Sequence, residues 1–134
     1  MTKALRFAIT ALRLCYGGFF VAVALYSGWA LLSGQGNPFV SGDGPGPRFQ
    51  HALLETGFMI PLMLVLYFVG GALLLPRRTA PLGLILLAPF MTVIVFYHLL
   101  LGGSAIWALG WLVATALLFW HFRAAFRPLV SFRA

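Results

Sequence analysis

Hydrophobic residues occupy this chain in long runs, and the longest uncharged run extends from Thr79 to Phe122. Only a Gly102-Gly103-Ser104 triplet interrupts it. A helix that crosses a bilayer needs about 20 mostly apolar residues, so this run is long enough for two crossings. Backbone amides in lipid must find partners inside the protein, and a helix satisfies them locally. The run therefore predicts a transmembrane hairpin of helices over residues 81–101 and 105–126.

Two further apolar segments precede this hairpin, at residues 5–32 and 49–75. Each is long enough to cross a bilayer once. The pattern thus predicts an all-α protein, a polytopic bundle of four transmembrane helices that forms one domain over residues 1–134. The connection between the first two helices is rich in Gly and Pro, which predicts an irregular loop with turns.

The composition supports a membrane protein and excludes several other classes. Hydrophobic residues make up 62% of the chain and charged residues 8%, whereas soluble domains carry about 25% charged residues. The single cysteine allows no internal disulfide and no cysteine-rich metal site. The two acidic residues lie too far apart in the sequence for a paired-carboxylate or Ser-His-Asp active site, which excludes a soluble type of hydrolase or kinase.

The chain has a net charge of +7, and the positions of its basic residues indicate how it is oriented in the membrane. Successive ends of the four predicted helices lie alternately on the two sides of the membrane. Eight of the nine basic residues lie near the ends on one side, and only Arg48 lies near an end on the other side. Because basic residues near short loops stay cytoplasmic, both termini are expected on the cytoplasmic side of a bacterial inner membrane. The positive charge then faces anionic lipid, and we expect no nucleic-acid site.

Small residues and one arginine stand out within the apolar segments. The pairs Gly17-Gly18 and Gly70-Gly71 would let helices approach closely, as small residues do in lipid. Arg13 lies about two turns into the first helix. Its side chain could extend to the head groups or pair with a carboxylate, since a charge inside a membrane is costly.

Several polar side chains are expected at a similar depth near the non-cytoplasmic side. His51 and Glu55 are four residues apart on one face of the second helix. His98 lies about 25 Å from the cytoplasmic start of the third helix, at 1.5 Å per residue. Tyr97 and Tyr26 share that level. Three interpretations stay open for this set: a hydrogen-bond network between helices, a quinone pocket, or a metal site of two imidazoles and a carboxylate.

Apolar motifs along the chain resemble those of a known family. The stretch Ala11-Leu12-Arg13-Leu14 with the following glycines resembles the first-helix opening of DoxX-like membrane proteins. The second-helix stretch from Glu55 to Leu62, leading into Gly70-Gly71, is similar to that family's second helix. The third helix matches through Pro81-Leu82-Gly83-Leu84, Leu87-Ala88-Pro89 and Phe96-Tyr97-His98.

The resemblance implies a compact four-helix membrane bundle with a redox association. DoxX-like proteins include the membrane subunit of a thiosulfate:quinone oxidoreductase and partners of oxidative-stress enzymes. Family members often have a Glu where this chain has Tyr67, and an Asn near the position of Val93. Without that Glu, Arg13 lacks the partner that the family pattern implies, so Arg13 and Tyr67 become candidate contacts for a partner subunit or lipid.

Two functions follow as hypotheses. The first is a non-catalytic accessory subunit of a larger membrane complex, such as an electron-transfer complex, with no enzyme activity of its own. The alternative is a quinone-interacting subunit of an oxidoreductase, with quinone as the only candidate cofactor. A transporter has little support, because corresponding broken helices are not evident in the two halves. The residues proposed for the quinone pocket are His51, Glu55, Tyr26, Tyr97 and His98.

Overall fold

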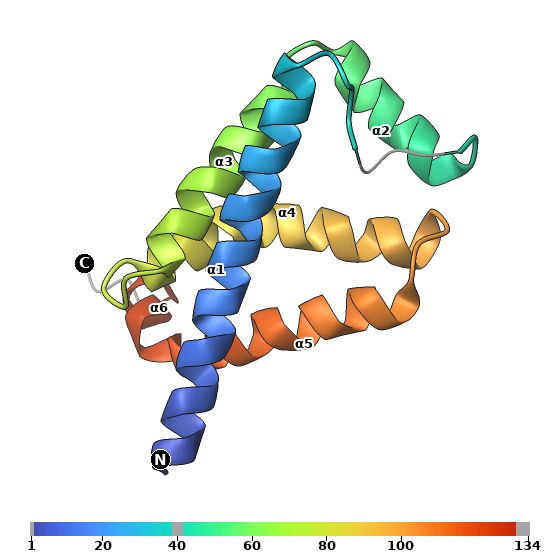
Figure 1. Cartoon of the computed structure of the whole chain (residues 1–134). Coiled ribbons are helices and arrows are strands. Elements are labelled where there is room, and N and C mark those ends of the chain that lie inside the picture. Colours follow the sequence, from blue (N-terminus) through green and yellow to red (C-terminus); the bar gives the residue numbers. More distant parts are fainter. Residues whose placement is uncertain (1, 39–41, 131–134) are drawn as a thin grey trace.

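A computed structural model describes residues 2–38 and 42–130, and within them the chain forms six α-helices (Figure 1). The prediction of an all-α protein is confirmed. The helices are α1 (Lys3–Leu32), α2 (Pro45–Glu55), α3 (Met59–Leu74), α4 (Ala80–Leu100), α5 (Ala105–His121) and α6 (Arg123–Val130).

Two of these helices, α1 and α4, are each long and apolar enough to cross a membrane alone. The successive helices α2 and α3 meet at a bend of 96°, and α5 and α6 meet at a bend of 75°. Counting each bent pair as one span gives four, so the described part of the chain has two to four candidate membrane spans. The first and third predicted segments correspond closely to α1 and α4.

The second predicted helix, residues 49–75, is not continuous. Gly57 has a φ of +75°, a conformation that glycine adopts without strain and that ends α2. The hydroxyl of Thr56 then accepts a hydrogen bond from the backbone N–H of Met59, the first residue of α3, at 3.1 Å. Pro61 follows in the first turn of α3, where its missing N–H costs nothing. These three residues together place the break.

The fourth predicted helix, residues 105–126, is also divided. It ends at His121, and the chain turns at Phe122 into α6. On α6 the ring of Phe126 packs 5.1 Å from that of Phe119, whereas Arg123 and Arg127 are exposed. A short helix with one apolar and one basic face is typical of a position along the membrane interface. Its amphipathic pattern explains why it leaves the direction of α5.

Helices α1 and α3 lie side by side, and glycines set their spacing (Figure 1). A Cβ on Gly17 would lie 2.8 Å from the carbonyl oxygen of Gly71, and a Cβ on Gly71 would lie 2.7 Å from that of Gly17. Gly83 of α4 meets Gly70 of α3 in the same way, at 2.6 Å. The predicted close approach is confirmed for Gly17, Gly70 and Gly71. It is wrong for Gly18, which faces open space.

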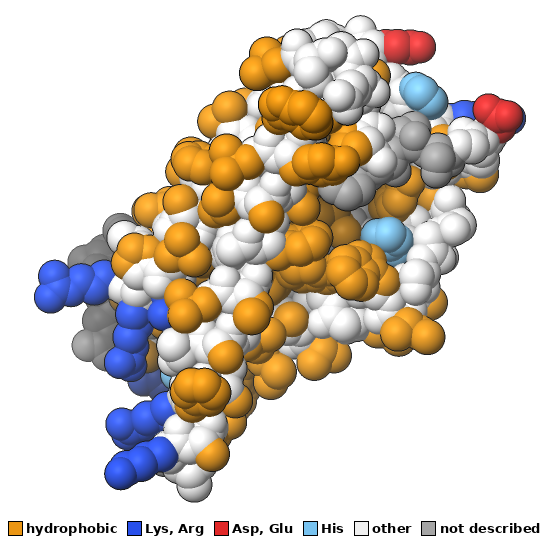
Figure 2. Space-filling model, in the orientation of Figure 1, with side chains coloured by type: hydrophobic (Ala, Val, Ile, Leu, Met, Phe, Trp, Pro, Cys, Tyr) orange, Lys and Arg blue, Asp and Glu red, His pale blue; other side chains and the backbone are white. Residues whose placement is uncertain are grey.

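Charged residues separate to the two ends of the molecule (Figure 2). We call the end with the N-terminus, the α3–α4 turn and α6 the basic end, and the opposite end, with α2 and the α4–α5 turn, the loop end. The described basic side chains at the basic end are Lys3, Arg6, Arg13, Arg77, Arg78, Arg123 and Arg127. Arg133 lies outside the described residues. The loop end carries both acids, Asp43 and Glu55, together with Arg48.

Candidate ligand-binding cavity

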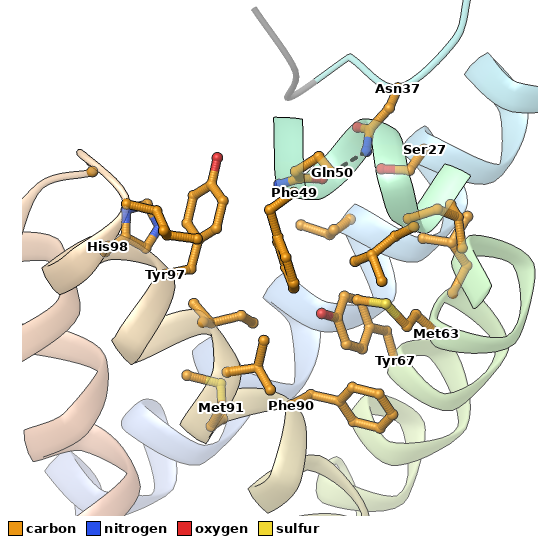
Figure 3. A pocket seen from close by; sticks show the side chains of 18 of the residues that line it. Ser27, Asn37, Phe49, Gln50, Met63, Tyr67, Phe90, Met91, Tyr97 and His98 are labelled. Atoms are coloured by element: carbon orange, nitrogen blue, oxygen red, sulfur yellow. Dashed lines mark hydrogen bonds between the residues drawn. The ribbon is translucent and has the colours of Figure 1, made fainter. Parts of the chain in front are cut away.

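A cavity of about 820 Å³ lies toward the loop end of the bundle (Figure 3). Helices α4 and α5 diverge there from α1 and α3, and α2 extends over the space between them (Figure 1). The 96° bend before α3 directs α2 across the bundle, so this helix covers the cavity and does not prolong α3. The cavity is thus a consequence of the break at Thr56 and Gly57.

The wall of the cavity is mainly aromatic and aliphatic, with contributions from five helices. Met63 of α3, Met91 of α4 and Phe49 of α2 project into it from different sides (Figure 3). Such a wall suits a flat apolar ring, because aromatic and thioether side chains adapt to it and pack on it. The other large apolar side chains of the wall are Phe19, Phe20, Leu53, Met59, Ile60, Leu64, Phe90, Ile94, Leu101, Trp107 and Trp111.

Tyr67 provides a polar group deep in the cavity. Its side chain is only 7% exposed, and its ring packs edge-on against Phe20 at 5.1 Å and Phe90 at 5.4 Å between ring centroids. Figure 3 shows its hydroxyl directed into the cavity. Among the described residues this hydroxyl has no hydrogen-bond partner. The hydroxyl opens onto the cavity, so it can donate a hydrogen bond to an acceptor atom of a ligand there.

A second polar group lies under α2. The side-chain amide of Asn37 donates a hydrogen bond to the Gln50 side-chain oxygen at 3.0 Å, which joins the first loop to α2 (Figure 3). Ser27 of α1 is buried beside them and also lines the cavity. The cavity therefore has polar groups at two levels, with aromatic side chains between them.

Two of the predicted site residues, Tyr97 and His98, line this cavity. Their rings meet edge-on with centroids 5.3 Å apart. The Nδ1 atom of His98 is buried against Gly103 and has no hydrogen-bond partner within the described residues. Nε2 is then the ring nitrogen of His98 that remains for a ligand.

The other three predicted site residues lie elsewhere. Tyr26 is exposed and stacks on Trp29, with ring centroids 6.4 Å apart. His51 and Glu55 share one face of α2, as the spacing predicts, but that face is exposed. The opposite face of α2 supplies Phe49, Gln50 and Leu53 to the cavity. The expected convergence of Tyr26, His51 and Glu55 with His98 is therefore not formed.

The separation of these residues also removes the ligand set of the predicted metal site. It required His51, Glu55 and His98 to meet. Within residues 2–38 and 42–130, no three His, Cys, Asp or Glu side chains lie close enough to hold a metal ion. The polar groups that do face the cavity are hydroxyls, amides and one imidazole, which suit hydrogen bonding to a neutral ligand.

Arg13 and Tyr67, the candidate partner contacts, both point inward. Arg13 is 8% exposed, and its Nη1 donates hydrogen bonds to the carbonyl oxygens of Leu74, at 2.5 Å, and Leu75. These carbonyls belong to the last turn of α3, where backbone oxygens lack partners within the helix. A cation also complements the negative end of a helix dipole. Arg13 thus holds the end of α3 to α1, a role that the sequence did not indicate.

Several cavity residues were not predicted, although some left a signal. Phe49 and Leu53 are four residues apart in a stretch that also carries Arg48, Gln50, His51 and Glu55, and four residues is the spacing of one helix face. That signal distinguishes an amphipathic α2 from the uniformly apolar α3. Trp107 and Trp111 are also four residues apart, in the uniformly apolar fifth helix. In the fold they line the cavity, and Trp111 also packs 4.9 Å from the Tyr16 ring.

Comparison of the chain with protein-family models, curated proteins and solved structures finds no match.

Proposed function

We propose that this membrane protein binds a quinone in the cavity between α1, α3 and α4. The observation that supports it most is the Tyr67 hydroxyl, which faces a large cavity with mainly aromatic and aliphatic walls. In this proposal the chain crosses a bacterial inner membrane four times, with both termini cytoplasmic. The cavity then lies in the outer leaflet, close to where membrane quinones dissolve.

The size and wall of the cavity support this ligand class. Small-molecule sites are commonly about 300–1,000 Å³, with mostly apolar walls and a few placed polar groups. At about 820 Å³ the cavity can hold a quinone ring with part of its apolar tail. The rings of Phe49 and Phe90 and the thioethers of Met63 and Met91 would pack on the ligand.

The polar groups support it as well, because a para-quinone has two carbonyl oxygens on opposite sides of its ring. Tyr67 would donate to one carbonyl. At the other polar level, the Asn37–Gln50 pair, Tyr97 and His98 offer donors to the second. Both contacts stabilise binding without any charge, which suits a site inside a bilayer.

Tyr67→Phe is expected to weaken quinone binding about 3- to 10-fold, because it removes one hydrogen bond and leaves the ring in place. Trp107 and Trp111 line the cavity, so quenching of tryptophan fluorescence by a short-chain quinone measures binding directly. The matched control is Tyr26→Phe, which removes the same hydroxyl outside the cavity and should leave the Kd unchanged. Equal affinity for the Tyr67→Phe variant and the unmodified protein would contradict the assignment of Tyr67.

An accessory role in an electron-transfer complex stays a prediction, as does the resemblance to DoxX-like proteins. The fold alters one argument for that role. Arg13 has partners in Leu74 and Leu75, so it needs no carboxylate from another subunit. Quinone binding is compatible with membership of such a complex, and it is the function that the cavity supports best.

A further inference from the structure

Three arginines and a histidine gather at the basic end from separate parts of the chain. Arg13 comes from α1, Arg77 from the α3–α4 turn, His121 from the end of α5 and Arg123 from the start of α6. Helices α4 and α5 pack against each other as a hairpin, so the turn before α4 and the junction after α5 lie at the same end of the molecule. Arg13 reaches that end through its hydrogen bonds to the carbonyl oxygens of Leu74 and Leu75, just before Arg77. We call these four residues the basic cluster.

Among the described residues, no Asp or Glu side chain lies at the basic end. The chain contains two acidic side chains, Asp43 and Glu55, and both lie at the loop end, on the opposite side of the molecule (Figure 2). Like charges that gather without a counterion repel one another and attract an anion from outside. Such a cluster therefore favours the binding of an anionic ligand.

Two members of the cluster are held in position by the fold. Arg13 is fixed by its hydrogen bonds to the end of α3. Arg123 donates from Nη1 to the Trp120 carbonyl oxygen at 3.0 Å, and its guanidinium carbon lies 4.6 Å from the centre of the Trp120 ring. Groups that are already ordered lose little entropy when a ligand binds. The cluster is thus prepared for an anion before one arrives.

The surface around the cluster is apolar and exposed. Trp120 is 68% exposed, and Leu75 and Leu117 are exposed as well. A soluble phosphate would make no use of these side chains, whereas the acyl chains of a lipid would pack on them. Basic groups between transmembrane helices on the cytoplasmic side are typical sites for anionic lipid head groups.

We propose that the basic cluster binds the head group of an anionic phospholipid, whose phosphate lies among Arg77, Arg123 and His121 and whose acyl chains lie along α5. This site is at the opposite end of the molecule from the cavity, and it does not depend on the proposed quinone.

Titration of the detergent-purified protein with phosphatidylglycerol, followed by native mass spectrometry, tests the proposal. Replacing Arg77 and Arg123 together by Gln should weaken binding about 30-fold, since each basic residue near an anionic surface contributes a factor of about 5. The matched control is the Lys3→Gln, Arg6→Gln double variant, which removes the same charge from the exposed start of α1 and should stay within about 2-fold of the unmodified protein. If the first double variant does not fold, Arg77→Gln alone should show a loss of about 5-fold.

Three results would overturn the proposal. Equal losses in the two double variants would mean that the whole basic end attracts lipid without a site. Phosphatidylcholine bound as tightly as phosphatidylglycerol would exclude recognition of the anion. Inorganic phosphate that binds alone and displaces the lipid would make this a site for a soluble anion.

Discussion

Replacing Gly71 by alanine is expected to lower the free energy of unfolding by about 3 kcal/mol, the upper part of the range for overpacked interiors. The new Cβ would lie 2.7 Å from the carbonyl oxygen of Gly17 and 3.0 Å from the Cβ of Phe20. Because the first of these is a backbone atom, a side-chain rotation cannot relieve the contact. Helices α1 and α3 would have to separate, and packing along their shared interface would be lost.

Thermal unfolding in detergent, followed by tryptophan fluorescence, measures this effect. For a chain of this size we expect the Tm to fall by about 10 °C. Gly18→Ala is the matched control, because Gly18 lies in the same helix and a Cβ there would meet nothing within 4 Å. Alanine at that position should raise stability slightly, since it restricts the unfolded chain. Similar Tm values for the two variants would contradict the close α1–α3 contact.

Arg13→Met is expected to cost about 2–3 kcal/mol. It removes the charged donor to the carbonyl oxygens of Leu74 and Leu75 and leaves them without partners at the end of α3. Methionine keeps most of the apolar stem, so the change reports mainly on the hydrogen bonds. Arg13→Lys should recover part of the loss, because an ammonium group still complements the helix dipole but reaches the carbonyls less well.

The same unfolding experiment measures this second effect. Arg6→Met serves as the control, since Arg6 lies on the same helix and is exposed. It should shift the Tm by no more than about 2 °C. An Arg13→Met variant as stable as the control would mean that Arg13 does not hold α3.

The membrane character and the positions of α1 and α4 follow from hydropathy, because lipid requires long apolar helices. The breaks inside the second and fourth segments do not, since hydropathy averages over a window and is insensitive to one residue. Gly57 ends α2 through its backbone conformation, with a φ of +75°. Its effect could be anticipated only by combining it with the Thr56 hydroxyl just before it and with Pro61 in the following turn.

The position of the candidate residues along each helix follows from the sequence, whereas the direction of their side chains around the helix axis does not. His98 and Tyr97 lie near the level that counting residues along the third helix indicates, and both line the cavity. His51 and Glu55 were placed on one face correctly, but the rotation of α2 relative to its neighbours decides whether that face is inside. Uniformly apolar helices carry no pattern that fixes this rotation. The inward position of Tyr67 could not be predicted for the same reason, because it depends on the packing of α3 on α1 and α4.

The central claim is that a quinone occupies the cavity. The most direct test is mass spectrometry of the natively expressed protein after gentle solubilisation. The measurement identifies both the small molecules and the proteins that are bound to the unmodified chain and to two variants. Met63→Trp fills the cavity, whereas Val65→Trp adds the same side chain to an exposed position of α3. We predict quinone on the unmodified protein and on Val65→Trp, and its loss from Met63→Trp. A protein recovered without quinone but in fixed ratio with partner subunits would contradict this account and favour the accessory role.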